Sequence, residues 1–278
     1  MRIFIAGATG VIGRRLVPLL VADGHEVTAL SRRSQVPGVT TVQGDVYDAA
    51  ALRELVAAAR PDVVMHQLTD LTSRDFARNG RIRREGTRNL VDAALAAGVR
   101  RVISQSVAWA YEPGDAPADE STPLDAHSAD ESRRGMVGAV AALEEITAEA
   151  PEWVVLRYGM LYGPDTWYTK GALMADLATA GQLPATCDVT SFLHIDDAAT
   201  AARAALTWPS GPVNIVDDDP TPATTWLPTF TQSVGAPIPA YPTPDTPRTP
   251  WARGATNAHA HTLGWTPAHP TWHTGFFT

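Results

Sequence analysis

The sequence is short of two reactive residue types. Its 278 residues include one cysteine, Cys187, and one lysine, Lys170. A single cysteine excludes an intrachain disulfide and any metal site built from several thiolates, and we expect it to behave as a small apolar side chain. The other permanently charged basic side chains are arginines, so Lys170 is the one side chain that could supply an ammonium group to a mechanism.

The chain also lacks an excess of positive charge and a long apolar run. Its formal net charge is −8, which argues against nucleic acid or an anionic membrane as a partner, because both require a basic face. It contains no window of about 20 apolar residues, and the first strand begins at once in MRIFIAG. We therefore expect a compact cytoplasmic protein that binds neither nucleic acid nor membranes.

Short apolar runs alternate with alanine-rich helical segments in the first half of the chain. The predicted strands are RIFIAG, EVTAL, TTVQG, PDVVMHQ, RRVISQS and EWVVLRYG. Helical periodicity lies between them, near residues 11–23, 48–59, 82–97 and 130–149. This alternation predicts an α/β fold, a doubly wound parallel sheet of the Rossmann type.

The alternation loosens after Gly159, and proline becomes dense from Pro209 onward. A helix is expected near residues 171–181, another over DDAATAARAAL, and a strand at PVNIV. We expect a small irregular C-terminal substrate lobe. The predicted dinucleotide-binding domain comprises residues 1–158 and about 190–216, and the substrate-binding lobe comprises residues 159–189 and 217–278. A disordered linker is the alternative for residues 236–250.

The segment GATGVIG lies between the first predicted strand and the first predicted helix. Glycines there permit a tight turn and a close approach of backbone N–H groups to a pyrophosphate, while the helix N-terminus adds partial positive charge. With a second strand ending about twenty residues later, this arrangement predicts dinucleotide binding. The expected contacts are Gly7, Thr9, Gly10, Val11, Ile12 and Gly13.

The predicted second strand ends at Leu30, and Ser31, Arg32 and Arg33 follow it. An acid at this point would hold the ribose 2′-OH of NAD, whereas a hydroxyl and guanidinium groups suit the 2′-phosphate of NADP. NADP(H) is therefore favoured over NAD(H) as the cofactor. The alternative is that these arginines are ordinary surface residues.

Asp45 and Val46 follow the third predicted strand. That position lies at the adenine edge of a dinucleotide site, where the Asp45 carboxylate could accept a hydrogen bond from the adenine amino group. Both residues are predicted cofactor contacts. Capping of the next helix is the alternative for Asp45.

These motifs and several later ones resemble the NAD(P)-dependent epimerase/dehydratase superfamily of extended short-chain dehydrogenase/reductases. The matching pieces are GATGVIG, GDVYD, VVMHQLT, EGTRNLVDAA, VRRVISQS, LRYGMLYGP and SFLHIDDAA, over residues 1 to about 205, with a late LGWTP. The resemblance implies a small-molecule substrate, and a homodimer formed through small-residue helices such as that at 131–145. It also implies cofactor contacts from Gln67, Leu68, Thr69, Ser104 and Tyr158.

The resemblance breaks at the catalytic centre. In that family a serine after the fifth strand and a Tyr-x-x-x-Lys pair on the next helix move the proton, and the lysine lowers the pKa of the tyrosine. Ser106 supplies the serine. Aligning the helix on Glu144 places Met136 at the tyrosine and Val140 at the lysine. No such pair exists elsewhere, because Lys170 has a threonine four residues before it.

Two residues are candidates to replace the missing groups. Tyr158 corresponds to a residue beside the nicotinamide and is the first candidate for a proton donor, although an unassisted phenol has a pKa near ~10. Arg83 takes the place of the family's assisting asparagine, and could lower that pKa or orient an anionic or carbonyl substrate. The alternatives are that Tyr158 merely packs on the nicotinamide, and that Arg83 forms an ion pair with Glu85 or with a carboxylate elsewhere. Four aromatic residues are predicted to line the substrate pocket: Tyr111, Tyr162, Trp167 and Tyr168. The alternative is that these side chains pack against the rest of the protein and do not contact a substrate.

Histidine offers a weaker signal. His194 lies in a tract that is largely structural in the family, and we consider it less suited to catalysis than Ser106. The tail histidines His259, His261 and His269, with His273, lack carboxylate or thiolate partners at a known ligand spacing, so no metal is predicted.

The sequence thus predicts an NADP(H)-binding reductase or epimerase-like enzyme that acts on a small organic carbonyl or alcohol. Ser106 would donate a hydrogen bond, and Tyr158 or a water would supply the proton. One alternative is a non-redox isomerase, lyase or cyclase that uses Ser106 and Arg83 on the same fold. The other is a non-catalytic regulatory protein that senses NADP.

Overall fold

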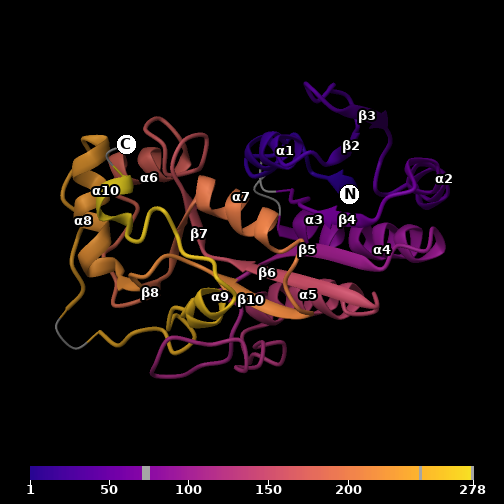
Figure 1. The fold of residues 1–278 in the computed structure, drawn as a ribbon. Helices are drawn as coiled ribbons and strands as arrows, with labels where there is room; N and C mark the ends of the chain where they lie inside the picture. The colour runs from indigo at the N-terminus through magenta and orange to yellow at the C-terminus, as the bar shows by residue number, and fades with distance from the viewer. Residues whose placement is uncertain (71–75, 244–245, 277–278) are drawn as a thin grey trace. The chain divides into compact units, whose positions relative to one another are not determined.

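A computed structural model describes residues 1–70, 76–243 and 246–276 (Figure 1). Seven strands form one sheet in the order β10-β6-β5-β4-β1-β2-β3. Strand β1 pairs in parallel with both β2 and β4, so that Ile5 lies between Ala29 and Met65. The order reverses beside β1, which is the doubly wound arrangement, and the predicted fold is confirmed. The seven strands are β1 Arg2–Ala6, β2 Glu26–Ser31, β3 Thr40–Gln43, β4 Val63–His66, β5 Arg101–Val107, β6 Glu152–Tyr158 and β10 Gly211–Ile215.

Helices connect these strands, as the alternating pattern predicted. A π-helical turn, η1 Ile82–Gly86, forms the first five residues of the third predicted helix. None of the described helices is both long enough and apolar enough to cross a membrane. The helices around the sheet are α1 Gly13–Ala22, α2 Ala49–Ala59, α3 Phe76–Arg81, α4 Thr87–Ala96, α5 Glu131–Thr147 and α7 Ile195–Ala204.

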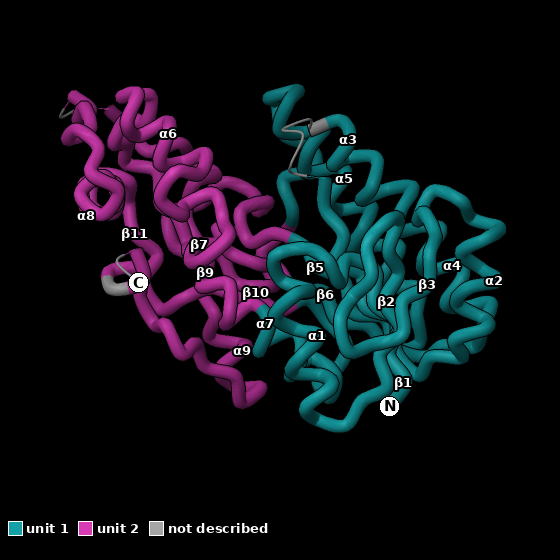
Figure 2. The backbone as a smooth tube through the Cα atoms, turned by 90° about the horizontal axis from the view of Figure 1, so that it is seen from above, with its two compact units in different colours: residues 1–106, 124–156, 199–212 teal, residues 107–123, 157–198, 213–278 magenta. Residues whose placement is uncertain are grey.

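The chain divides into two compact units, coloured separately in Figure 2. Unit 1 comprises Met1–Ser106, Leu124–Leu156 and Ala199–Pro212; unit 2 comprises Val107–Pro123, Arg157–Ala198 and Val213–Thr278. Unlike the predicted lobe, unit 2 also includes residues 107–123, 157–158, 190–198 and 213–216. The assignment of cofactor and substrate binding to particular parts of the chain stays a prediction.

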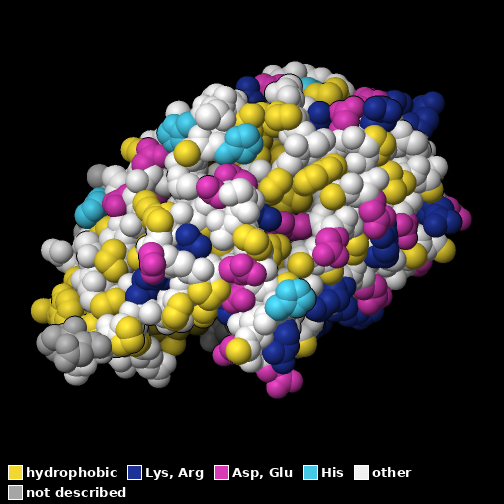
Figure 3. Space-filling model, turned by 90° about the horizontal axis from the view of Figure 1, so that it is seen from below, with side chains coloured by type: hydrophobic (Ala, Val, Ile, Leu, Met, Phe, Trp, Pro, Cys, Tyr) yellow, Lys and Arg dark blue, Asp and Glu magenta, His cyan; other side chains and the backbone are white. Residues whose placement is uncertain are grey.

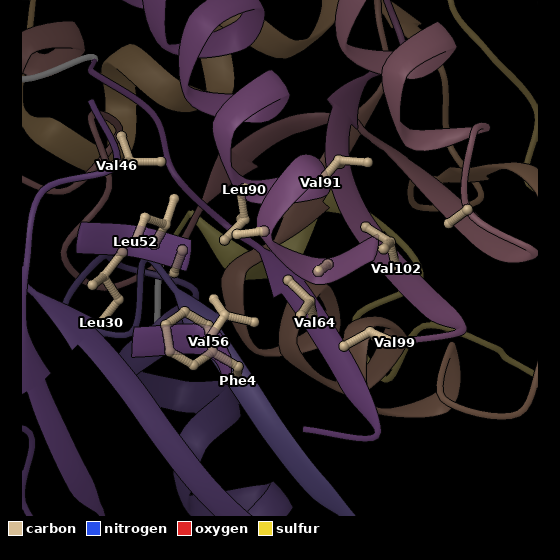
Figure 4. Close-up of a cluster of buried hydrophobic side chains, with 14 of the residues drawn as sticks. Phe4, Leu30, Val46, Leu52, Val56, Val64, Leu90, Val91, Val99 and Val102 are labelled. Carbon is tan, nitrogen blue, oxygen red and sulfur yellow. The ribbon is translucent and has the colours of Figure 1, made fainter. Parts of the chain in front are cut away.

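Alternation along the strands builds the core of unit 1. Phe4 of β1 and Val64 of β4 lie on one face of the sheet, because side chains of a strand point alternately to its two sides. Leu52 and Val56 of α2 and Leu90 of α4 cover them, as Figure 4 shows. This packing places the strand ends, and therefore the predicted site residues, on a rigid base.

Unit 2 contains elements that the sequence did not predict. Helix α8 forms with Pro228 inside it, because Trp226, Leu227 and Phe230 bury one face in an aromatic cluster around Phe192. Proline is unfavourable within a helix, and here tertiary packing outweighs it. The remaining elements are β7 Met160–Tyr162, α6 Leu173–Thr179, β8 Val189–Thr190, β9 Phe192–His194, β11 Thr221–Pro222, α8 Ala223–Val234, α9 Ala258–Thr262 and α10 Trp272–Gly275.

Two glycines at the turn between β1 and α1 have no room for a side chain. Gly7 has φ +105°, which favours glycine, and a Cβ atom there would lie 2.4 Å from the backbone oxygen of Gln67. A Cβ atom on Gly13 would lie 2.2 Å from the backbone oxygen of Gly7. The two glycines therefore allow the turn, the start of α1 and the segment after β4 to pack directly together.

Replacing Gly13 by alanine should strongly destabilise the protein, because the obstructing atom is backbone and not a flexible side chain. We expect the free energy of unfolding in urea to fall by about 2 kcal/mol or more. Gly135→Ala on α5 is the matched control, since a Cβ atom there meets nothing within 4 Å. This control should gain about 0.5–1 kcal/mol. Equal changes in the two variants would contradict the packing argument.

Candidate cofactor and catalytic site

The N-terminus of α1 presents unpaired backbone donors. The Gly10 amide donates to the Gly7 carbonyl oxygen at 3.0 Å and closes the turn. No side chain caps the helix. In the described part of the chain, the backbone N–H groups of Val11, Ile12 and Gly13 donate to no acceptor. Three such donors at a positive helix end fit an anionic pyrophosphate, so the residues present suit a dinucleotide.

The residues after β2 also suit a phosphate. Strand β2 continues through Ser31, one residue beyond the predicted end, and the Ser31 hydroxyl accepts the Ser34 amide at 3.1 Å. Arg32 and Arg33 are exposed, and neither forms an ion pair with any described carboxylate. Their guanidinium groups therefore remain available to an external anion.

Asp45 has a local hydrogen-bond partner but caps no helix. Its Oδ1 accepts the Tyr47 amide at 3.0 Å, whereas Asp48 caps α2 by accepting the Ala51 amide at 3.0 Å. The helix-capping alternative for Asp45 is therefore wrong. Val46 is buried in the core. Adenine recognition by this pair stays a prediction.

A buried histidine orders the segment that follows β4. His66 Nδ1 accepts the Leu68 amide at 3.2 Å, so Nε2 carries the hydrogen and donates it to the Thr87 hydroxyl at 2.9 Å. Burial, helped by the positive charge of Arg83, lowers the pKa of His66 to about 4, and the ring is neutral near pH 7. His66 thereby fixes the predicted cofactor contacts at 67–69. The sequence analysis assigned it no role.

Ser106, Glu144 and Arg83 form a charged group in unit 1. Ser106 is 4% exposed, and its hydroxyl donates to Glu144 Oε1 at 2.6 Å. Arg83, in η1, is 7% exposed; burial lowers its pKa to about 10, opposed by the negative charge of Glu144. Glu144 thus links two residues that were predicted to be catalytic. Its position four residues after Val140, on one face of α5, was the signal that could have identified it.

Ser104, a predicted cofactor contact, is fully buried. Its hydroxyl oxygen accepts the hydroxyl of Thr147 on α5 at 2.9 Å. Thr9, at the phosphate-binding turn, is exposed. The structure therefore gives Ser104 a packing contact, while Thr9 is accessible to a ligand.

Tyr158 belongs to unit 2 and Ser106 to unit 1. The Tyr158 side chain is buried, and its hydroxyl lies 3.5 Å from the carbonyl oxygen of Ala198. Its role as a proton donor stays a prediction.

Tyr111 lies in a polar network inside unit 2. Its hydroxyl donates to Asn214 Oδ1 and accepts from Arg157 Nη1 at 3.0 Å. The Asn214 amide in turn donates to the carbonyl oxygens of Ala118 at 3.2 Å and Thr256 at 3.0 Å. This arrangement suits the packing alternative for Tyr111, because the hydroxyl is already occupied.

The other three predicted pocket residues differ in burial. Tyr162 and Tyr168 belong to the aromatic cluster around Phe192, and burial raises the pKa of both phenols. The Tyr162 hydroxyl lies 3.4 Å from the carbonyl oxygen of Thr271. Trp167 is half-buried. Packing suits the two tyrosines, and Trp167 retains exposed surface for a ligand.

The structure brings His194, Asp197 and His269 together, with one potential ligand atom of each within 4.8 Å of the others. Asp197 accepts the amides of Ala268 and His269 at 2.9 Å and His269 Nδ1 at 3.0 Å. The two imidazole rings stack with centroids 3.7 Å apart. These bonds fasten the tail to the start of α7, so the cluster has a structural explanation without a metal. The sequence analysis missed Asp197 because it lies far from the tail in sequence.

Residues 3–216 match the model of the NAD dependent epimerase/dehydratase family. The chain belongs to this family. Across 99% of its length it is 45% identical to the 3-diazoavenalumate denitrifying reductase of a Streptomyces species, covering 99% of that protein. It is 31% identical to the ceramide reductase of Caulobacter vibrioides, over 70% of this chain and 57% of the relative.

Solved structures of the epimerase/dehydratase fold agree. The UDP-glucose 4-epimerase of Thermus thermophilus in complex with NAD superposes with a TM-score of 0.77, at 23% identity, over 100% of this chain and 97% of the epimerase. The predicted family is confirmed, and the chain is an NAD(P)-binding oxidoreductase or epimerase-like enzyme.

Apolar side chains occupy the two positions of α5 at which the family's Tyr/Lys pair is expected. Val140 on α5 is fully buried, and Met136 is half-buried. The predicted catalytic centre in unit 1 therefore takes its buried positive charge from Arg83 on η1. In the family, this charge is expected from a lysine at the position of Val140 on α5.

Asp217 is a buried carboxyl group that the sequence analysis did not consider. It follows β10, is 1% exposed, and its Oδ2 has no hydrogen-bond partner among the described residues. Burial, together with the nearby charges of Asp219 and Asp218, raises its pKa to about 8. The group is therefore mostly protonated at neutral pH.

This raised pKa makes stability depend on pH. Between about 4 and 8 the folded protein retains a proton that the unfolded chain has lost, so its free energy of unfolding should fall as pH rises, by up to ~1.4 kcal/mol per pH unit. Asp217→Asn should remove this decline in urea unfolding measured across the range. Asp176→Asn, at an exposed carboxylate on α6, is the control. Parallel profiles for Asp217→Asn and the parent protein would refute the argument.

Proposed function

We propose that the protein is a reductase that replaces the diazo group of a carboxylate-bearing substrate by hydrogen, with a nicotinamide dinucleotide as the hydride source. The similarity to the 3-diazoavenalumate denitrifying reductase, at 45% identity over 99% of both chains, carries this proposal. The absence of the family's Tyr/Lys pair from the predicted catalytic centre also supports it.

The missing proton donor agrees with this chemistry. Reduction of a carbonyl places a proton on oxygen, which is the task of the family's tyrosine. A diazonium group is already cationic and leaves as N2, so it needs no proton from the enzyme. Met136 and Val140 therefore stand in for two groups that this reaction does not use.

The reaction also balances without a further reactant. When bound, NAD(P)H supplies a hydride: the diazonium ion and NAD(P)H give the hydrogen-substituted product, N2 and NAD(P)+. The C–N bond breaks, a C–H bond forms, and both nitrogen atoms leave together. The chain has only to hold the two reactants in line and exclude water.

The charged group in unit 1 suits such a substrate. Glu144 offsets the positive charge of Arg83, which would otherwise repel a diazonium cation. Ser106 directs its hydrogen at Glu144, so its oxygen lone pairs are available towards a positive group. Arg83 remains the candidate for orienting the substrate carboxylate.

Reduction of a carbonyl or oxidation of an alcohol, the chemistry predicted from the sequence, is the second candidate. The ceramide reductase relative favours it. This candidate requires a proton donor, for which Tyr158 is the first candidate. Both reductase relatives favour a redox enzyme over a non-redox isomerase or an NADP sensor.

An assay of NADPH oxidation with a carboxylated aryl diazonium salt tests the proposal. We expect one N2 and one hydrogen-substituted product for each NADPH oxidised. A panel of ketones and aldehydes should give no turnover. Oxidation of NADPH with carbonyl compounds alone, or with no compound, would overturn the proposal.

The variant Tyr158→Phe separates the two chemistries. If hydride transfer to a diazonium group needs no proton, kcat should stay within about twofold of the parent. A proton donor, in contrast, typically contributes about 100- to 10,000-fold. A loss of that size with the diazonium substrate would count against the mechanism.

We further propose NADP(H) as the preferred cofactor. Arg32→Ala combined with Arg33→Ala should weaken NADPH binding about 10- to 100-fold, because charge-assisted bonds to the 2′-phosphate are lost. Binding of NADH, which lacks that phosphate, should change little. Arg53→Ala, at an exposed arginine on α2, is the control. Calorimetric titration of the parent and both variants with each ligand measures all six dissociation constants, and equal weakening of NADPH and NADH would contradict this preference.

The remaining expectations about partners stay proposals. A homodimer through the small-residue face of α5 is supported by the absence of bulky side chains at Gly135 and Gly138. Figure 3 shows acidic and basic side chains interspersed on one face, which supports the expectation of no nucleic-acid partner. The cytoplasmic location also stays a prediction.

A further inference from the structure

Gln105 carries a buried hydrogen-bond donor that the protein itself does not satisfy. It lies on β5 between Ser104 and Ser106, whose hydroxyls bond to α5 on one side of the sheet. Strand alternation places Gln105 on the opposite side. The residue is 8% exposed, and its Nε2 has no partner among the described residues. Such groups are rare in native proteins, and a bound ligand is a common reason for them.

The position of Gln105 in the sheet identifies the ligand. His66, the last residue of β4, pairs with Ser104 of β5, and Gln67 and Gln105 are the residues that follow this pair along the chain. Gly7, in the phosphate-binding turn, packs directly on the backbone of Gln67. Gln105 of β5 is therefore close to the segment that follows β4, on which the phosphate-binding turn packs. This is the edge of the sheet formed by the carboxyl ends of the strands, where ligands of doubly wound folds bind.

The sheet order assigns this edge to one half of a dinucleotide. In doubly wound folds the dinucleotide crosses the point where the strand order reverses, with one mononucleotide on each side. Here the predicted contacts of the adenosine half lie at the ends of β2 and β3: Ser31 ends β2, Arg32 follows it, and Asp45 follows β3. The strands β4 and β5, on the other side of β1, are left for the nicotinamide half.

We propose that Gln105 recognises the nicotinamide mononucleotide half of the bound cofactor, with its side-chain Nε2 donating a hydrogen bond to an oxygen of that half. The carboxamide and ribose oxygens are acceptors of the required kind. Binding completes the hydrogen bonding of the amide and positions the hydride-bearing half above β5. The inference needs dinucleotide binding and does not depend on the diazo substrate.

The test compares two ligands by calorimetric titration in the absence of substrate. NADPH contains the nicotinamide half, and adenosine 2′,5′-bisphosphate lacks it. Gln105→Leu should weaken NADPH binding about tenfold and leave the binding of adenosine 2′,5′-bisphosphate within about twofold. Gln182→Leu, at an exposed glutamine, is the matched control and should change neither constant.

Thermal unfolding without ligand gives a second measurement. Gln105→Leu should be at least as stable as the parent, because an unpaired buried donor is replaced by an apolar group of similar size. A lower Tm would show that the amide is already satisfied in the free protein, which overturns the inference. Unchanged NADPH binding, or equal weakening of the two ligands, would also overturn it.

Gln105→Glu keeps the test decisive if the leucine variant does not fold. This change retains the shape of the side chain and replaces the donor by an acceptor, so NADPH should bind at least tenfold more weakly while adenosine 2′,5′-bisphosphate is unaffected. Because no substrate is present, failure here is distinguishable from failure of the proposed reduction. The latter would appear only in the turnover assay.

Discussion

The direct backbone contact between the β1–α1 turn and the segment after β4 determines the geometry of the predicted cofactor site. Gly7 and Gly13 leave no space between these segments, so the orphan amides at the start of α1 are held at the same edge as the ends of β4 and β5. His66 stabilises the segment after β4 through hydrogen bonds of its ring to the Leu68 amide and to the Thr87 hydroxyl. The site is thereby assembled from backbone groups, which sequence changes elsewhere disturb little.

The predicted catalytic centre differs from that of the family in the position of its positive charge. The lysine position on α5 is occupied by Val140, which is part of the core, while Arg83 supplies a buried positive charge from η1. Glu144 balances it and accepts the Ser106 hydroxyl. A centre of this kind retains electrostatic positioning but has lost the group that delivers a proton, and this difference separates its proposed chemistry from carbonyl reduction.

The sequence predicted the parts of the structure that depend on local pattern. Strands and helices of the sheet follow from alternating and helical periodicity, and the phosphate-binding turn follows from its glycines. Helix α8 was not predicted because Pro228 is unfavourable inside a helix. The helix is stabilised by tertiary packing of its apolar face, which the local sequence pattern does not indicate. Glu144 and Asp197 were missed for a related reason: each gains its meaning from a partner that is distant in sequence, Ser106 and His269 respectively.

The order of synthesis constrains how unit 2 acquires its core. Ala118, made early, bridges to Ala255, and the Phe192 cluster is completed by Trp272. A nascent chain therefore exposes aromatic surface from the synthesis of Phe192 until Trp272 has been added. Unit 1 has received its last segment at Pro212, whereas unit 2 still lacks Trp272 at that point, so unit 1 can complete its folding first.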